Sequence, residues 1–367
     1  GVTSTTLTGN TPGTGAGQWT VVSGGGVTSF GDATDAGTVF TGVAGATYVL
    51  RWTITSGVCA ASSDEVTIRF DETPVASAGA DIAQCANSTF TLGATNPALG
   101  TGQWSVISGP GTIANINSYN TTITGVTAGS STTLRWTVTN GSCEDTDDVV
   151  LTNRNSPVPT LSSDFTTICA GETVVFTAGG GTSYEFLING STAQNGADNT
   201  YDTNALTHGQ IVSVRVTDGF GCTATSAGIT MTVNPLPVVN LVSSDTDNSI
   251  CAGSPVTFTA TPSGALSYDF RINNVSALLS AVNTFTTSAL ADNDIVTVVV
   301  STAAGCEATS AGITMNVDAV PTTADAGLDQ LTLCGVTGTT LTGNSAVTGT
   351  GQWTVVSGGG VTSFGDA

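Results

Sequence analysis

The stretch VRVTDGFGCTATSAGITMTV, residues 214–233, decides the predicted fold, and it recurs at 298–317 as VVVSTAAGCEATSAGITMNV. Apolar residues occupy alternate positions in each copy, as in Ile229-Met231-Val233. This period of two is typical of a β-strand with one buried face. A glycine-containing turn and a cysteine separate the alternating runs, so each copy predicts short paired strands beside a candidate disulfide.

The same alternation extends along the 367-residue chain, and Gly, Asn and Asp clusters interrupt it about every ten residues. Only 9% of the residues are charged, while β-branched and turn-forming residues dominate. Seven or so short strands in about 80 residues predict a small two-sheet sandwich. We therefore predict an all-β fold, a linear array of small immunoglobulin-like antiparallel β-sandwich domains with one disulfide each.

Repeated units of about 80 residues build the chain, and they are of two kinds. Type A carries Gly-Gln-Trp near its front and Leu-Arg-Trp before its second cysteine, as in GQWSVISG (102–109) and LRWTVTNGSC (134–143). Type B begins with Ile-Cys-Ala-Gly, at 168–171 and again at 250–253. Short proline-bearing linkers separate the units and predict end-to-end stacking into a semi-rigid rod.

These boundaries predict five domains. They are type A at 1–75, which lacks its first cysteine; type A′ at 76–158; type B at 159–236; type B′ at 237–320; and a truncated type A at 321–367.

A longer period of 334 residues is also present. Residues 335–367 match residues 1–33 at all but five positions. In this register Cys334 corresponds to the position immediately before Gly1. We expect a cysteine at that position and further copies of the period in the parent chain.

Eight cysteines occur, and none lies in a C-x-x-C metal or redox pattern. In each unit one cysteine opens the domain and another follows its penultimate strand, so we predict disulfides within single domains. Such disulfides indicate an oxidising compartment and an extracellular, cell-surface location. The predicted pairs are Cys85–Cys143, Cys169–Cys222 and Cys251–Cys306, while Cys59 and Cys334 are expected to pair with residues outside this sequence.

The charge is strongly acidic, with 27 acidic residues against six arginines and no lysine, a formal net charge of −21. Such a charge repels nucleic acids and anionic lipid headgroups. No apolar stretch approaches the ~20 residues that a membrane-spanning helix needs. The sequence predicts no nucleic-acid partner and no direct membrane insertion.

The acidic clusters have two interpretations. They are either solvated surface charge or calcium ligands, since Ca²⁺ prefers carboxylate oxygens. No calcium-loop motif is present, so calcium is the one candidate cofactor and no other is predicted. The candidate ligands are Asp145, Asp147, Asp148, Asp245 and Asp247.

The tryptophans recur at equivalent positions of alternating strands, which favours core anchors over exposed platforms for sugar rings. They are Trp19, Trp52, Trp104, Trp136 and Trp353.

Catalysis is not predicted. The only histidine, His208, lies in a polar turn that has no histidine in the matching type B′ unit. With no lysine and one such histidine, serine and cysteine nucleophiles lack their usual activating base. We predict no catalytic residue and a chain that is not an enzyme.

The strings GTGQWSVISGPGT, LRWTVTNGSC, ICAGETVVFTA, YEFLINGS and VRVTDGFGC resemble the tandem immunoglobulin-like and PKD-like repeats of giant Bacteroidota surface adhesins or filaments. The resemblance covers essentially the whole chain. It implies export by type 9 secretion and service as an adhesin stalk or filament, sometimes in gliding motility. It also implies contact with outer-membrane secretion or motility machinery through parts outside this sequence.

Several functional hypotheses follow. The first is a structural stalk or filament segment whose partners are the neighbouring repeats of the same chain. The second is a repeat module that binds surface glycans, host protein or substratum by avidity. Subunits that assemble into a surface fibre remain a further alternative.

Overall fold

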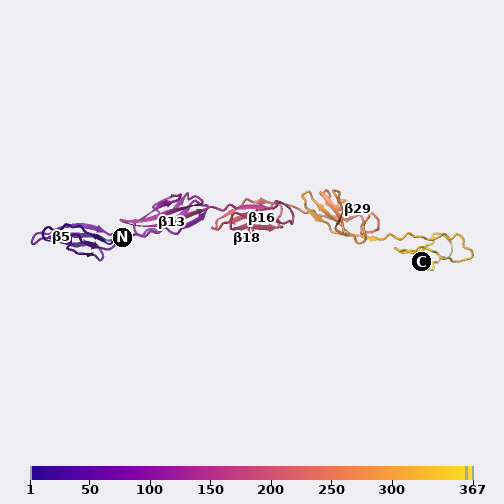
Figure 1. Ribbon diagram of the computed structural model, residues 1–367, viewed down its shortest axis with the longest axis horizontal. Helices are drawn as coiled ribbons and strands as arrows, with labels where there is room; N and C mark the ends of the chain where they lie inside the picture. Colours follow the sequence, from indigo (N-terminus) through magenta and orange to yellow (C-terminus); the bar gives the residue numbers. More distant parts are fainter. Residues whose placement is uncertain (1, 360–362, 366–367) are drawn as a thin grey trace.

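The computed structural model describes residues 2–359 and 363–365, and it shows four β-sandwich domains that follow one another in a line (Figure 1). The fold is all-β, and the domains are of the immunoglobulin-like type. No helix in the described part of the chain is long and apolar enough to cross a membrane.

Domain 1 has two three-stranded sheets, with strand orders β1-β4-β3 and β2-β5-β6. Every pairing is antiparallel. Its strands are β1 (Ser4–Thr6), β2 (Ala16–Ser23), β3 (Ser29–Phe30), β4 (Val39–Thr41), β5 (Thr47–Thr55) and β6 (Ser62–Arg69).

Domain 2 repeats this arrangement and adds a fourth strand beside the last one. Its sheets have the orders β10-β11-β8 and β7-β13-β12-β9. Its strands are β7 (Ile82–Cys85), β8 (Phe90–Gly93), β9 (Thr101–Ser108), β10 (Thr112–Ile113), β11 (Asn120–Thr124), β12 (Ser130–Asn140) and β13 (Cys143–Arg154).

Domain 3 has one sheet with strand order β14-β16-β19, a larger sheet with order β18-β17-β20-β21, in which β22 also pairs with β20, and a two-stranded ladder of β15 and β23. Its strands are β14 (Thr160–Ser163), β15 (Thr167–Cys169), β16 (Val174–Gly179), β17 (Ser183–Ile188), β18 (Ser191–Gly196), β19 (Thr200–Thr203), β20 (Ile211–Thr217), β21 (Thr223–Thr225), β22 (Ile229–Thr230) and β23 (Thr232–Asn234).

Domain 4 repeats the pattern of domain 3 strand for strand. Its strands are β24 (Asn240–Ser243), β25 (Ser249–Cys251), β26 (Val256–Thr261), β27 (Ser267–Ile272), β28 (Val275–Ser280), β29 (Thr284–Thr287), β30 (Ile295–Ser301), β31 (Glu307–Thr309), β32 (Ile313–Thr314) and β33 (Asn316–Asp318).

One pairing departs from the predicted antiparallel sandwich. In domains 2, 3 and 4 the strand that carries the opening cysteine runs parallel to the last strand of its own domain. Cys85 lies opposite Arg154, Cys169 opposite Asn234 and Cys251 opposite Asp318. The opening cysteine is therefore at the end of the domain where the chain leaves for the next one.

Each domain has its own buried core, built from the inward residues of alternating strands. In the type A domains two tryptophans form the centre, with ring centroids 5.1 Å apart for Trp19–Trp52 and 5.0 Å apart for Trp104–Trp136. All four are buried, which confirms their predicted core role. The fifth, Trp353, is half-buried.

The described residues of 319–365 form no strand. Domain 1 explains why, because residues 1–33 contain β1, β2 and β3, which pair only with β4 and β5. The matching residues 335–367 thus carry three strand sequences without their partners. A truncated type A unit cannot form its own ladder.

The Trp136 ring requires a glycine on the neighbouring strand. A Cβ added to Gly102 would lie 2.0 Å from the ring, and Gly17 has the same relation to Trp52 at 2.1 Å. Replacing Gly102 with alanine should destabilise domain 2 by about 1–3 kcal/mol through overpacking. Faster hydrogen–deuterium exchange in β12 than in the parent chain would report this loss.

The matched control is Gly93→Ala in β8, where an added Cβ meets nothing within 4 Å. That variant should exchange at the parent rate. Equal exchange in the two variants would contradict the packing argument.

Candidate functional site: the domain junctions

The disulfides in the described part of the chain join neighbouring domains. Cys85 of domain 2 bonds Cys222 of domain 3, and Cys169 of domain 3 bonds Cys306 of domain 4. Both bonds span 137 residues, and both have Cα atoms 5.6 Å apart. The junctions are thus closed covalently, and we treat them as the candidate functional site.

This overturns the predicted pairs Cys85–Cys143, Cys169–Cys222 and Cys251–Cys306, and with them the expectation of one disulfide within each domain. The physical reason is distance. Cys85 lies opposite Arg154 at one end of β13, whereas Cys143 begins that strand eleven residues earlier. Eleven residues of strand span roughly 36 Å, far beyond the reach of a disulfide.

The cysteine of the penultimate turn lies at the other end of each domain, facing the domain before it. Cys222 sits between β20 and β21, and Cys306 between β30 and β31. Each therefore meets the opening cysteine of the preceding domain. The equal spacing of 137 residues was visible in the sequence, and it is the signal that could have indicated this pairing.

A cation–π contact adds to the disulfide at the junction of domains 2 and 3. The guanidinium carbon of Arg154 lies 4.5 Å from the centroid of the Phe220 ring, and its Nη1 donates to the Phe220 carbonyl at 3.2 Å. Phe220 itself is 69% exposed, so Arg154 covers part of an otherwise solvent-facing ring. Sequence reasoning identified neither residue.

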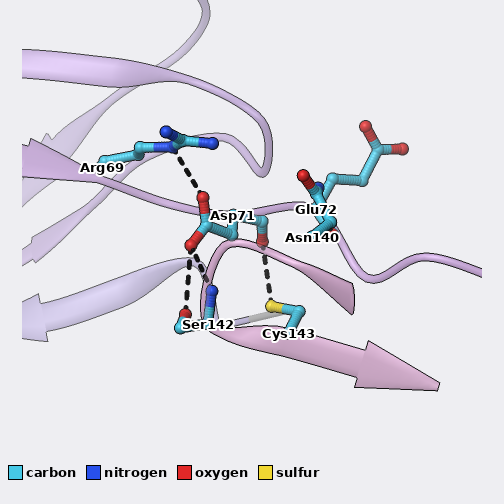
Figure 2. Close-up of polar contacts among 6 residues, drawn as sticks. All are labelled: Arg69, Asp71, Glu72, Asn140, Ser142 and Cys143. Atoms are coloured by element: carbon cyan, nitrogen blue, oxygen red, sulfur yellow. Dashed lines mark hydrogen bonds and ion pairs between the residues drawn. The ribbon is translucent and has the colours of Figure 1, made fainter. Parts of the chain in front are cut away.

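The junction of domains 1 and 2 is held by a carboxylate (Figure 2). Asp71 Oδ2 accepts hydrogen bonds from the Ser142 amide at 2.8 Å and the Ser142 hydroxyl at 3.2 Å, and its Oδ1 pairs with Arg69 Nε at 2.6 Å. Beside it, Asn140 Nδ2 donates to the Glu72 carbonyl at 2.8 Å. Asp71 thereby attaches the end of domain 1 to the β12–β13 turn of domain 2.

The pKa of Asp71 is lowered, first by the hydrogen bond from the Ser142 amide and further by the Ser142 hydroxyl and the Arg69 guanidinium, against the opposing effect of desolvation. A carboxyl whose pKa is lower in the folded state stabilises that state at pH values above its unfolded pKa. This contribution is lost as the pH falls through the folded pKa.

Two of the calcium candidates hold the linker instead. Asp145 and Asp147 are on β13, and their carboxylates accept the backbone N–H groups of Ala76 and Ala78, each at 2.8 Å. The linker that enters domain 2 is therefore fixed along β13.

The remaining candidates also have protein partners. Arg135 donates to both oxygens of Asp148 at 2.7 and 2.9 Å, and these bonds lower the pKa of Asp148. Asp245 and Asp247 lie before β25 in domain 4 and both accept from the Ser249 amide. The structure does not bring the β13 carboxylates and the domain 4 pair together. No group of three or more His, Cys, Asp or Glu side chains suited to a metal occurs among the residues described.

A hollow of about 650 Å³ lies on domain 2 beside the core tryptophan. Its lining includes the exposed side chains of Asn96, Gln103, Asn117 and Tyr119. Trp136 forms its floor, and the Nε1 of this buried ring has no hydrogen-bond partner. In domain 1 the equivalent Trp52 Nε1 donates to the Asn10 carbonyl at 3.2 Å. The lone histidine, His208, is exposed in the loop before β20 and does not contribute to this hollow.

No protein-family model and no curated protein matches the sequence. Among solved structures, the chain is similar to the fibronectin(III)-like modules of CbhA from Clostridium thermocellum, with 11% identity over 43% of this chain and 93% of that one and a TM-score of 0.29. It is also similar to a three-domain I-band fragment of titin (11% identity, 68% and 99% coverage, TM-score 0.38). A third similar structure contains the eight N-terminal immunoglobulin domains of Down Syndrome Cell Adhesion Molecule (11% identity, TM-score 0.32), of which the match covers 84% of this chain and 47% of that one.

The Asp71 contact makes the first junction sensitive to pH. The protection of the Ser142 amide, corrected for the intrinsic exchange rate, should fall as the pH drops through the lowered pKa of Asp71. Asp71→Asn should remove most of that protection at neutral pH. Hydrogen–deuterium exchange resolved to the β12–β13 turn measures both effects.

Asp198→Asn is the control, since it neutralises an exposed carboxylate of domain 3. Ser142 protection that stays constant from neutral pH to pH 2 in the parent chain would contradict the role of Asp71.

Proposed function

We propose that this chain is a structural segment of an extracellular stalk or filament that carries tension without catalysing a reaction. The observation that carries the proposal is the pair of disulfides that join successive domains in the same register. Disulfides persist in oxidising surroundings, which supports a secreted or cell-surface location. The linear order of the domains supports a role in reach (Figure 1).

The two disulfides close a covalent ring. One route from Cys85 to Cys306 follows the chain to Cys169 and crosses the second disulfide, and the other crosses the first disulfide to Cys222 and then follows the chain. Each route contains 84 residues of chain, whereas 221 residues separate Cys85 from Cys306 in sequence. Pulling the ends apart loads both routes in parallel, so unfolding releases little length.

The finer proposal follows from the resemblance of the repeats. We infer a place in a giant surface adhesin or filament of a Bacteroidota cell, exported by type 9 secretion and, in some such proteins, used in gliding. The partners are then neighbouring repeats of the same chain, with surface glycans, host or substratum met elsewhere on the molecule. Secretion or motility machinery would be contacted through other parts of the protein.

The ring makes a specific prediction for single-molecule force spectroscopy with handles at the two termini. The fully unfolded oxidised chain should be shorter than the reduced chain by 137 residues of contour, the span of one disulfide. At about 3.4 Å per residue this is roughly 470 Å. Cys222→Ser should leave the contour unchanged, because the second disulfide still spans 137 residues.

Only the double variant Cys222→Ser with Cys306→Ser should reach the reduced length. Cys59→Ser, which removes an unpaired thiol, is the matched control. If the single variant lengthened the chain, the two routes would not act in parallel, and the tension-carrying proposal would fail.

Glycan binding is a second candidate, favoured by the hollow on domain 2. Amide side chains and the unpartnered Trp136 indole suit sugar hydroxyls, and the exposed Tyr119 ring suits a sugar face. In a titration with an oligosaccharide panel followed by tryptophan fluorescence, Tyr119→Ala should weaken binding at least tenfold. The absence of any fluorescence change across the panel would count against this function.

A further inference from the structure

We infer that Cys143 is a disulfide site and that its partner is the opening cysteine of the type A domain that precedes it in the same chain. The cysteine is half-buried at the junction of domains 1 and 2, and it is a free thiol in this structure. The inference rests on the geometry of the junctions, and it holds whether or not the array serves as a stalk.

The junction of domains 3 and 4 shows what a closed junction looks like. Cys169 lies opposite Asn234 in the parallel ladder of β15 and β23. The Sγ of its disulfide partner, Cys306, lies 3.9 Å from the Asn234 carbonyl oxygen. The cysteine from the following domain thus contacts the residue that opposes the opening cysteine.

The junction of domains 1 and 2 has the same contact with one member absent. The Cys143 thiol donates to the Asp71 carbonyl at 3.5 Å (Figure 2). If Asp71 opposes an opening cysteine, Cys143 is already in the position that Cys306 occupies in the closed junction.

Two ion pairs fix the register that makes Asp71 this residue. Arg51 on β5 pairs with Glu65 on β6, and Arg135 on β12 pairs with Asp148 on β13. Six residues after each acidic partner come Asp71 and Arg154 respectively.

Arg154 is the residue that lies opposite Cys85, the opening cysteine of domain 2. Asp71 is therefore the position of domain 1 against which an opening cysteine would pair.

The long repeat supplies that cysteine. Cys334 precedes Gly335, and residues 335–367 repeat residues 1–33, so its counterpart falls directly before Gly1. The three residues before Cys334 are Leu-Thr-Leu, a strand-forming sequence like that of β7. In the described structure the outer edge of β6 lacks the parallel neighbour that β7 provides for β13.

The bond forms by ordinary thiol–disulfide exchange. The two thiols lose two protons and two electrons, and a disulfide oxidant accepts both electrons and is reduced to two thiols. The Sγ–Sγ bond that results closes the first junction as the others are closed.

The test uses the full chain with Gln-Leu-Thr-Leu-Cys, the sequence of residues 330–334, placed directly before Gly1. The protein is refolded with oxidised glutathione at high dilution, alkylated and mapped by mass spectrometry without reduction. We expect one new linkage within a single chain, between the added cysteine and Cys143, while Cys59 remains alkylated.

Two controls keep the result interpretable. Cys143→Ser in the extended chain should leave the added cysteine alkylated, and an extension with the cysteine one residue earlier should crosslink at least tenfold more slowly. The Cys85–Cys222 and Cys169–Cys306 bonds report that each variant has folded.

The inference is overturned if the added cysteine bonds Cys59 or stays free in a folded chain. It is equally overturned if the linkage to Cys143 forms only between two chains.

Discussion

The parallel pairing of each opening strand with the last strand of its own domain is the constraint on which the junctions depend. It places Cys85 beside Arg154 and Cys169 beside Asn234, at the exits of their domains. An antiparallel edge strand would run the other way and carry the cysteine back toward the domain entrance. The pairing of three or four residues in each domain thus decides which domains become covalently joined.

Much of the fold was predictable from the sequence because it follows from local pattern. Period-two alternation gave strands, glycine-containing turns gave their ends, and the repeated Trp104 and Trp136 gave the core of the type A domains. The disulfide partners were not predictable in this way, because they depend on which end of a sandwich each cysteine occupies. A sequence pattern that gives strands and cysteines leaves strand direction open, and Cys143 and Cys222 are misassigned for that reason.

The carboxylates illustrate a second limit. Asp145 and Asp147 alternate along one strand, which in sequence suits a cation as well as it suits backbone donors. The structure gives each an amide of the linker, at Ala76 and Ala78. Such partners lie 69 residues away and belong to an irregular segment, so no periodicity could reveal them. Asp71 belongs to the same class, a carboxylate whose role depends on the domain that follows it.

The ring of two disulfides has a consequence for survival outside the cell. Because two covalent routes connect Cys85 with Cys306, hydrolysis of any single peptide bond between them leaves the chain in one piece. A protease must cut two separate segments of the ring before the distal part is released. An exposed loop in domain 3 can therefore be nicked while the molecule still holds whatever lies at its far end.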